Sequence, residues 1–419
     1  MFDFSLTYKV KNSQNREAWT EVALPPDTAR QKVFYRLISP TPANVRIDED
    51  GNWLARFNVQ KGEILEVKAE GSVQIYADKH KQYDWKEPAD WGIYLAPTAY
   101  WQSEDEKIKE LARTLGTTEK IYDFVVKTLN YDYERIRQGA ERLGGRLALE
   151  HPDAAICTEF ADLFVSLARA AGIPAREVEG YAYTTNPQVQ PLSLLSDVLH
   201  AWPEYWDNQK HEWVPVDPTW EKTTGGVDYF SNFGLDHFTF AIHGVDPTLP
   251  LPAGSYKQEG LTKKDVVVSF GKQPLPVRVE LATSVKIAAS GIFGRNFKIE
   301  ANIQNKGGVA QYNLPIEVSV SGIVLNKNKG DSIKQIPPYG YVTEEVEGYL
   351  PWTLLLPPGK IAVVLKAGEQ QVETYLPQRN YMFGFVLPYL LGLVLVAGGG
   401  WGGYLLKEKF FTKRDKIIT

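Results

Sequence analysis

The stretch CTEFADLFVSLARAAGIPAR, residues 157–176, decides the fold of the central part of this chain. Its apolar residues recur at the spacing of one helix face and predict a buried helix: Phe160, Leu163, Phe164, Leu167 and Ala171. Gly172 and Pro174 follow at positions where helices commonly end. Cys157 is therefore expected in the first turn, where the partial positive charge of a helix N-terminus favours a thiolate. The alternative is that this lone cysteine is a small buried apolar residue.

A histidine and an aspartate follow this helix on two predicted strands. His200 lies in VLHAWPEYW and Asp217 lies in HEWVPVDPTW, and the polar residues 207–210 separate the two segments. If the segments form a hairpin in which Trp206 pairs with His211, His200 lies directly opposite Asp217. A shift of one residue would place the two side chains on opposite faces, so this register is a specific prediction.

The three side chains supply the groups that thiol acyl transfer needs. Cys157 would attack a carbonyl carbon, and His200 would take the proton and return it. Asp217 would hold the imidazole in one tautomer and stabilise its charged form. The backbone N–H of Cys157, at the start of the helix, is the expected donor to the oxyanion.

Weaker candidates surround this predicted site. A second oxyanion donor is expected upstream, where Tyr131 and Tyr133 follow a helix predicted at about 118–130. Trp202 is a further candidate for substrate binding. Trp202 and Trp220 are expected either to exclude water from the site or to belong to the core.

The remaining titratable residues are expected to have structural roles. His211 is predicted at the hairpin turn and exposed to solvent, and His237 and His243 flank the apolar segment FTFAI, with a metal pair as the alternative. Glu159 and Asp162 are predicted on the exposed side of the Cys157 helix, as helix-dipole partners or surface charges. Because the chain has no CxxC, HExxH or DxDxDG motif, we expect no metal and no other cofactor.

Taken in order, these elements resemble the transglutaminase-like superfamily, a branch of the papain-like thiol enzymes. The resemblance covers about residues 103–243 and rests on the helix-borne Cys, LARAAGIPAR, His-Ala-Trp and Asp-Pro-Thr. It implies an α+β domain with a catalytic triad of Cys157, His200 and Asp217. It also implies an acyl-enzyme formed from peptide or side-chain amides, which water hydrolyses or an amine converts to a cross-link. Ile156 departs from the small residue, often Gly, that many members carry before the cysteine.

The segments on either side of this domain predict β structure. Residues 1–80 alternate apolar and polar side chains and predict an N-terminal β-sandwich. Residues 265–378, beginning with VVVSF, predict a C-terminal Ig-like β-sandwich. With 34 Gly and 26 Pro in 419 residues, the composition is typical of turn-rich β structure. The expected chain is multidomain: a β-sandwich, the central α+β domain, an Ig-like sandwich and one transmembrane helix.

The predicted transmembrane helix spans residues 381–406, which carry no charged side chain and are long enough to cross a bilayer. The basic residues of the tail 407–419 predict a cytoplasmic C-terminus and an extracytoplasmic bulk. The opening MFDFSLTYKV contains no signal segment, so either the true start is missing or the protein is tail-anchored with its bulk inside. The charge bias favours the first alternative. The overlapping GxxxG pairs predict helix-mediated dimerisation and comprise Gly398, Gly399, Gly402 and Gly403.

Charge and cysteine content narrow the function further. The net charge of −5 offers no basic field to nucleic acid, and a single cysteine forms no internal disulfide. We therefore expect a membrane-anchored thiol enzyme on a microbial cell surface, with protein or peptide substrates. The alternatives are an inactive scaffold of the same superfamily and a cell-surface binding protein whose β domains carry the function.

Overall fold

The chain divides into two compact units, which are described separately. In this computed structural model the first unit comprises Met1–Glu280, Asn305–Tyr312 and Gln335–Tyr341, and the second comprises Leu281–Gln304, Asn313–Lys334 and Val342–Thr419. The structure describes residues 1–80, 87–88, 90–138, 141–183, 199–256, 264–274, 276–290, 295–326, 332–351, 358–382, 386–387, 390–398, 401 and 407.

Two sheets form the N-terminal part of the first unit. One has the strand order β11-β1-β6-β3 and contains β1 (Phe2–Lys11), β3 (Gln31–Ser39), β6 (Ile64–Ile75) and β11 (Val266–Phe270). The other has the order β2-β5-β4 and contains β2 (Ala18–Leu24), β4 (Asn44–Ile47) and β5 (Trp53–Val59). In β1 every second residue is buried because successive side chains of a strand point to opposite faces.

Strand β11 lies in a different place from the one the sequence suggested. The segment VVVSF was predicted to open the C-terminal sandwich, but β11 pairs antiparallel with β1, with Phe2 opposite Phe270. β11 thereby becomes the edge strand of this sheet, and Lys9 forms an ion pair of 2.5 Å with Asp265, just before β11. A single apolar run carries no information about which sheet edge it will join, so the sequence could not decide this pairing.

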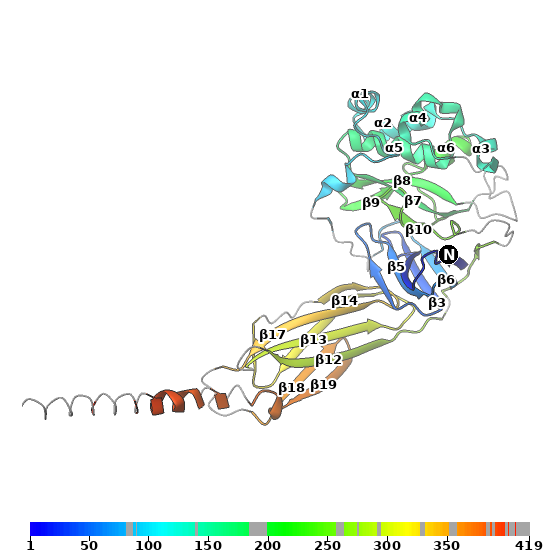
Figure 1. Ribbon diagram of the computed structural model, residues 1–419. Helices are drawn as coiled ribbons and strands as arrows, with labels where there is room; N and C mark the ends of the chain where they lie inside the picture. The colour runs from blue at the N-terminus through cyan, green and yellow to red at the C-terminus, as the bar shows by residue number, and fades with distance from the viewer. Residues whose placement is uncertain are drawn as a thin grey trace, which may run out of the picture. The chain divides into compact units, whose positions relative to one another are not determined.

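A second layer of the first unit contains a sheet of four antiparallel strands, here called the central sheet, in the order β10-β7-β8-β9. Its strands are β7 (Ala175–Ala182), β8 (His200–Asp207), β9 (Glu212–Pro215) and β10 (His237–His243). Figure 1 shows helices gathered on one face of this sheet. These helices are α1 (Glu106–Leu115), α2 (Thr118–Thr128), α3 (Tyr133–Gln138), α4 (Gly145–Glu150), α5 (Cys157–Ala170) and α6 (Pro218–Thr223). The α+β fold predicted for the centre of the chain is confirmed.

Helix α5 is the buried centre of this layer. Its apolar residues Phe160 and Phe164 are inaccessible to solvent, as the helical spacing predicted. The helix ends at Ala170, and Gly172 follows with φ of +77°, a left-handed conformation that favours glycine. Trp101 packs into the same core. Short 3₁₀ helices lie outside it at Trp91–Tyr94, Pro152–Ala154 and Gln378–Asn380.

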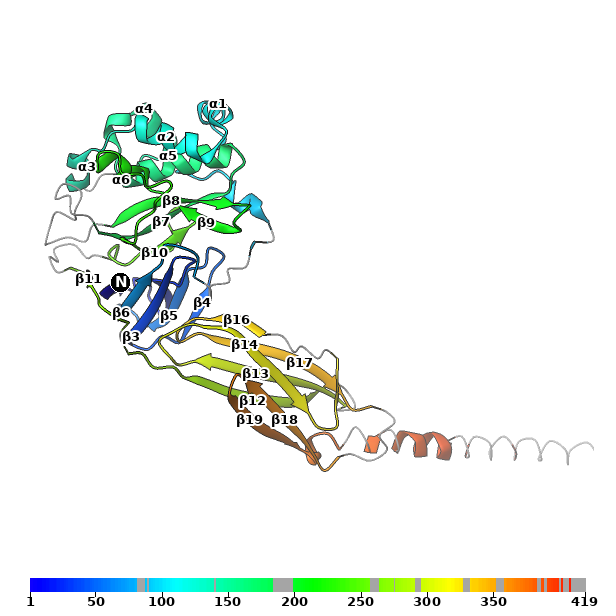
Figure 2. The ribbon, with the colours of Figure 1, turned by 180° about the vertical axis from the view of Figure 1, so that it is seen from behind.

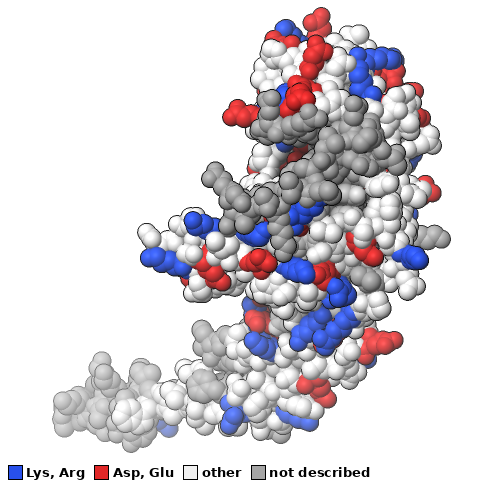
Figure 3. Space-filling model, turned by 90° about the vertical axis from the view of Figure 1, so that its right-hand side faces the viewer, with Lys and Arg blue, Asp and Glu red and all other residues white. Residues whose placement is uncertain are grey.

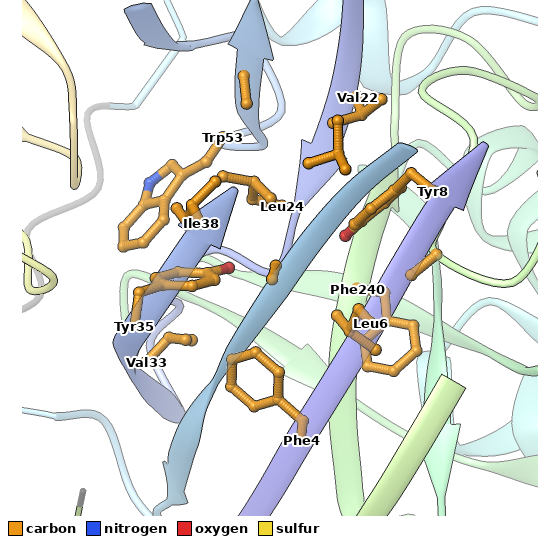
Figure 4. Close-up of a cluster of buried hydrophobic side chains, with 14 of the residues drawn as sticks. Phe4, Leu6, Tyr8, Val22, Leu24, Val33, Tyr35, Ile38, Trp53 and Phe240 are labelled. Carbon is orange, nitrogen blue, oxygen red and sulfur yellow. The ribbon is translucent and has the colours of Figure 1, made fainter. Parts of the chain in front are cut away.

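The central sheet and the N-terminal sheets share one hydrophobic core. Figure 4 shows Phe240 of β10 beside Leu6 and Tyr8 of β1 in a cluster of buried side chains. Polar contacts join the same layers, because the side-chain amide of Gln31 donates to the carbonyl of Thr239 at 3.0 Å. The N-terminal strands therefore support the central sheet from the face opposite to the helices.

The hairpin of β8 and β9 has a different register from the predicted one. Trp206 pairs with Trp213 and not with His211, so the register is shifted by two residues. The loop begins one residue later because the Asp207 carboxylate accepts hydrogen bonds from the backbone N–H groups of Gln209 and Lys210, at 2.8 and 3.1 Å. A shift of two residues keeps every side chain on its predicted face.

The second unit is built mainly from two four-stranded sheets, seen from behind in Figure 2. The first sheet has the order β12-β13-β17-β15 and contains β12 (Leu281–Ser290), β13 (Asn296–Asn305), β15 (Val324–Leu325) and β17 (Tyr341–Tyr349). The second has the order β16-β14-β18-β19 and contains β14 (Gln311–Val320), β16 (Ser332–Ile336), β18 (Lys360–Ala367) and β19 (Gln370–Pro377). Phe297, Ile361 and Leu376 from both sheets share a core, which agrees with the predicted sandwich. Its relation to immunoglobulin domains stays a prediction.

Charged side chains of both signs are mixed on the surface. Figure 3 shows basic and acidic residues side by side on one face. Exposed pairs include Arg46 with Glu21 at 2.6 Å and Lys298 with Glu345 at 2.7 Å. Such pairs contribute little to stability, typically below about 1 kcal/mol each.

The structure does not confirm the predicted transmembrane helix at 381–406. Residues 386–387, 390–398 and 401 are helical, but several positions of the segment lie outside the described residues. Within the described part of the chain, no helix has the length and apolar character needed to cross a membrane. Gly398 is helical, whereas Gly399, Gly402 and Gly403 of the predicted GxxxG pairs lie outside the described residues.

Candidate active site

Cys157 is the first residue of α5, where the sequence placed it. Ile156 precedes the helix in an extended conformation, with φ of −117° and ψ of −174°. The N–H of Cys157 is one of the first four helix amides, which have no acceptor within the helix. The residue is 6% exposed, so the side chain of Cys157 is almost completely shielded from solvent.

The carboxylate of Glu159 anchors this helix start. It accepts hydrogen bonds from the backbone N–H of Ile156 at 2.9 Å and from that of Leu143 at 2.8 Å, and the guanidinium of Arg135 lies at 3.4 Å. The prediction that Glu159 is an exposed residue is wrong, because its side chain is fully buried. Its place in the first turn agrees with the predicted interaction with the helix dipole.

Asp162 was also predicted on the surface, and this too is wrong. Its carboxylate is fully buried, pairs with the guanidinium of Arg142, and accepts a hydrogen bond of 2.9 Å from the indole of Trp101. Burial raises the pKa of Asp162 to about 6, although Arg142 opposes the shift. The sequence assigned the polar face of α5 to solvent, but α4 and the loop before it cover that face.

His200 joins the thiol to the carboxylate of Asp217. Its Nε2 lies 2.7 Å from Oδ2 of Asp217, and its ring lies close enough to the thiol of Cys157 for the two groups to interact. Burial of the ring opposes its charged form, but the charge of Asp217 and these hydrogen bonds raise the pKa of His200 to about 9. Because Nε2 is engaged by Asp217, Nδ1 is the ring nitrogen left to face the sulfur.

Asp217 is fully buried between β9 and α6. It caps α6, since its Oδ1 accepts the backbone N–H of Trp220 at 2.9 Å. The hydroxyl of Tyr122 donates to the Asp217 carbonyl at 3.0 Å and ties this residue to α2. Burial would raise the pKa of the carboxyl, but His200 and His237 lower it to about 2. The structure therefore brings Cys157, His200 and Asp217 together despite the shifted hairpin register.

His237 is a member of this cluster that the sequence did not assign to the site. Its Nε2 lies 3.1 Å from Oδ2 of Asp217, and its Nδ1 lies 2.8 Å from Oδ1 of Asp236. Gly180 allows β10 to approach β7 closely, because a Cβ there would clash with the carbonyl of Phe238. The Asp-His pair at the start of FTFAI is the one sequence feature that could have pointed to His237 as a site residue. It does not reveal that β10 lies beside β7.

Two tryptophans cover the imidazole of His200. The Trp202 ring stacks beside it with a centroid distance of 5.9 Å and an interplanar angle of 26°, and the Trp220 ring lies at 5.1 Å. Both indoles are almost completely buried, at 2% and 3% exposure. The two predicted roles were exclusion of water and membership of the core, and both apply. Each indole belongs to a buried cluster, and each shields the imidazole of His200 from water.

Tyr131 lies near the thiol, as the sequence suggested, whereas the structure gives Tyr133 no comparable contact with it among the described residues. Burial raises the pKa of Tyr131, and the negative charge of Cys157 adds to the effect. The two tyrosine rings contact each other with a centroid distance of 4.9 Å. The assignment of Tyr131 to the oxyanion, like that of Trp202 to substrate binding, stays a prediction.

His200, Asp217 and His237 are also the only described residues whose ligand atoms cluster as a metal site would, within 4.8 Å of one another. Those atoms are hydrogen-bonded to each other, so hydrogen bonding accounts for the cluster and we assign no metal to it. His243 is buried with Nε2 at 2.9 Å from the carbonyl of Pro250, and His211 is exposed beside Glu87.

A cavity of about 220 Å³ lies behind the site, between the central sheet and the N-terminal strands. Trp202 and His237 form part of its wall, together with Arg30 and Gln31 from the N-terminal sheet. Neither Cys157 nor His200 is among its lining residues, so this cavity is not the opening through which a substrate reaches the thiol.

An α+β fold with a thiol, an imidazole and a buried carboxylate in series defines the papain-like class of thiol proteins. Residues 105–218 match the family model of the transglutaminase-like superfamily. Residues 105–218 therefore form a domain of the transglutaminase-like superfamily, as the sequence predicted.

Similar proteins have been characterised to different degrees. A protein-glutamine gamma-glutamyltransferase of Pseudomonas aeruginosa is 41% identical over 66 residues, which are 16% of this chain and 10% of that protein. An uncharacterized protein of Mycobacterium tuberculosis is 36% identical over 67 residues, 15% of this chain and 21% of that protein. The chain thus matches about a tenth and a fifth of these relatives' lengths.

Solved structures are more distant. The periplasmic domain of TgpA from Pseudomonas aeruginosa is 18% identical, with a TM-score of 0.28 over 51% of this chain and 73% of that one. A score this low adds nothing to the family assignment.

Proposed function

We propose that this protein is a thiol enzyme that acts on peptide or side-chain amides through an acyl-enzyme at Cys157. One observation carries the proposal: the His200 imidazole is hydrogen-bonded to the Asp217 carboxylate and lies beside the thiol of Cys157, so the three groups are in series. In that series each group has the neighbour it needs, since a thiol requires a base and the base requires an orienting partner.

In the first half of the reaction, Cys157 gives its proton to Nδ1 of His200 and its sulfur forms a bond to the amide carbon. The carbonyl oxygen becomes an oxyanion, for which the backbone N–H of Cys157 is the available donor. When the intermediate collapses, the carbon–nitrogen bond breaks and the proton on Nδ1 passes to the leaving nitrogen. A thioester on Cys157 remains.

Asp217 keeps His200 in the protonation state that this reaction requires. Its carboxylate holds Nε2 and stabilises the imidazolium that forms when the thiol loses its proton. Trp202 and Trp220 exclude water from this hydrogen bond, which strengthens the interaction because the surroundings are less polar than water.

The second half of the reaction decides the product. Water or a primary amine attacks the thioester carbon and loses a proton to Nδ1, and the sulfur leaves as the thiolate. Attack by water gives hydrolysis, and attack by a lysine amine gives a cross-link between chains. Both outcomes follow from the same acyl-enzyme.

A panel of glutamine-containing peptides, incubated with and without a primary amine, tests this function. Mass spectrometry of the products separates backbone cleavage, side-chain deamidation and amine incorporation. We expect at least one of these products with the native protein and none with Cys157→Ala. The His211→Gln variant is a matched control far from the thiol and should retain activity. If no peptide changes, the protein is a scaffold or binding protein of this superfamily.

We also propose that residues 381–406 tether the protein to a membrane with its bulk outside the cytoplasm. Support comes from the uncharged sequence and from the exposed apolar side chains Leu393, Val394, Leu395 and Val396. After expression in a bacterial host, the full chain should remain with the membrane in alkaline carbonate, whereas a chain ending at Asn380 should not. Release of both chains would contradict the tether.

A further inference from the structure

Oδ2 of Asp217 is shared by two imidazoles, and only one of them contacts the thiol. Nε2 of His200 lies at 2.7 Å and Nε2 of His237 lies at 3.1 Å from the same oxygen. A triad needs only the first of these contacts. The second contact joins the fully buried carboxylate of Asp217 to His237, whose side chain is 1% exposed.

We propose that His237, held by Asp236, is a positioning residue of this site: as a second imidazolium on Asp217 it fixes the carboxylate and shares its negative charge with His200. The proposal rests on the proposed function, because it assigns His200 and Asp217 their roles as base and orienting partner.

The contacts of His237 define its protonation state. Its Nε2 faces Oδ2 of Asp217 and its Nδ1 faces Oδ1 of Asp236, at 3.1 and 2.8 Å. An ionised carboxylate only accepts hydrogen bonds, so both ring nitrogens must donate, and a ring with two N–H donors is an imidazolium. These contacts raise the pKa of His237 to about 8, although burial of the ring opposes the charge.

Aromatic rings fix the orientation of this imidazole. Phe233 lies at 4.3 Å between ring centroids, Trp202 and Trp220 each lie at 4.9 Å, and Tyr229 lies at 6.1 Å. The titratable or charged groups that face it in the described chain are Asp217, Asp236, His200 and Tyr229. Because the surroundings are otherwise apolar, the two carboxylates determine its charge.

Charges alternate along the resulting series. When the thiol is ionised, Cys157 is negative, His200 positive, Asp217 negative, His237 positive and Asp236 negative. The ring centroids of the two histidines lie 5.7 Å apart, so a positive charge on His237 opposes protonation of His200. Without it, Asp217 would hold the proton on His200 more tightly, and His200 would return that proton to the leaving nitrogen less readily.

Histidine-selective NMR titration of the full chain tests the proposal directly. In His237→Gln the side-chain amide can still donate to Asp217 but carries no charge. We expect the His200 titration midpoint to rise by about one pH unit, and the alkaline limit of activity to rise with it. Asp236→Asn should lower the midpoint of His237 and move that of His200 in the same upward direction. Thermal unfolding checks that each variant is folded.

His211→Gln is the matched control, because His211 forms a similar pair with Glu87 at 3.0 Å on the surface. It should leave the His200 midpoint unchanged. An unchanged midpoint in both His237→Gln and Asp236→Asn would overturn the proposal, as would a change in the wild-type titration on adding EDTA. Loss of acyl-enzyme formation with the predicted titration shifts intact would instead refute the proposed function.

Discussion

Asp217 is held in the site by hydrogen bonds from several elements. It accepts N–H donors from His200, His237 and the backbone of Trp220, and its own carbonyl accepts the Tyr122 hydroxyl. A carboxylate with three donors is held in one orientation and kept ionised. Its position is therefore determined by α2, α6 and β10 together, and it can orient the imidazole of His200.

The histidines of the site make its stability depend on pH. The pKa values of His200 and His237 are raised to about 9 and about 8, above the usual 6.5. Their contribution is complete below pH 6.5 and is lost as the pH rises through 8 and 9. We expect unfolding by urea to show a fall in stability on the order of 5 kcal/mol over this interval.

Asp217 makes stability depend on pH at the acidic end of the range, because its pKa is lowered to about 2. Its contribution to stability is present above the unfolded value near 3.8 and is lost as the pH falls toward 2.

His200→Gln serves as the control for the alkaline interval and should flatten the fall in stability there. An equal slope in the native protein and this variant would contradict the assigned ion pair.

The sequence predicted three residues of the candidate site, missed a fourth and misplaced two charged residues beside it. Cys157, His200 and Asp217 were predicted from the start of a helix, two neighbouring strands and the chemistry of the three residue types, and their order also resembles a known family. His237 was missed because its role depends on β10 lying beside β7, a pairing between segments more than fifty residues apart. Glu159 and Asp162 were misplaced because helical periodicity cannot reveal a second layer covering the polar face of α5.

At the scale of elements, the start of α5 depends on one carboxylate. Glu159 satisfies the backbone N–H groups of Ile156 and Leu143 within a buried space. Glu159→Gln should reduce the free energy of unfolding by about 2–4 kcal/mol, because it removes a buried charge and the ion pair of that charge with Arg135. Urea denaturation measures this change.

Glu119 provides a matched control for that variant. It also lies in the first turn of a helix, α2, but its side chain is exposed. Glu119→Gln should cost less than about 1 kcal/mol. Equal losses from both variants would show that the buried hydrogen bonds of Glu159 contribute nothing beyond a helix-dipole interaction.

The sequence predicted helices and strands well where a local pattern of residues determines them. It predicted strand pairing and register less well, because these depend on segments that are distant in the chain. The buried face of α5 and its end before Gly172 follow from local periodicity and turn chemistry. The register of β8 and β9 was wrong by two residues because the side chain of Asp207 sets where the loop begins. The pairing of β11 with β1 joins the two ends of the first unit, and no local signal predicts it.

For the whole molecule, two separate hydrophobic cores predict two unfolding transitions. Trp53 is fully buried in the first unit, and Phe297 is 1% exposed in the second. In differential scanning calorimetry, Trp53→Ala should lower one transition and Phe297→Ala the other, each by about 3–5 kcal/mol of stability. A single transition that both variants lower equally would contradict the division into two units.

The central claim is that Cys157 forms a covalent acyl-enzyme with the help of His200. The most direct test is intact-protein mass spectrometry after rapid acid quench of the full chain with an amide substrate from the peptide panel. We expect a mass increase equal to the acyl group, located on Cys157 by peptide mapping, and a much slower increase in His200→Ala. An unmodified thiol during turnover, or an adduct on another residue, would contradict the account.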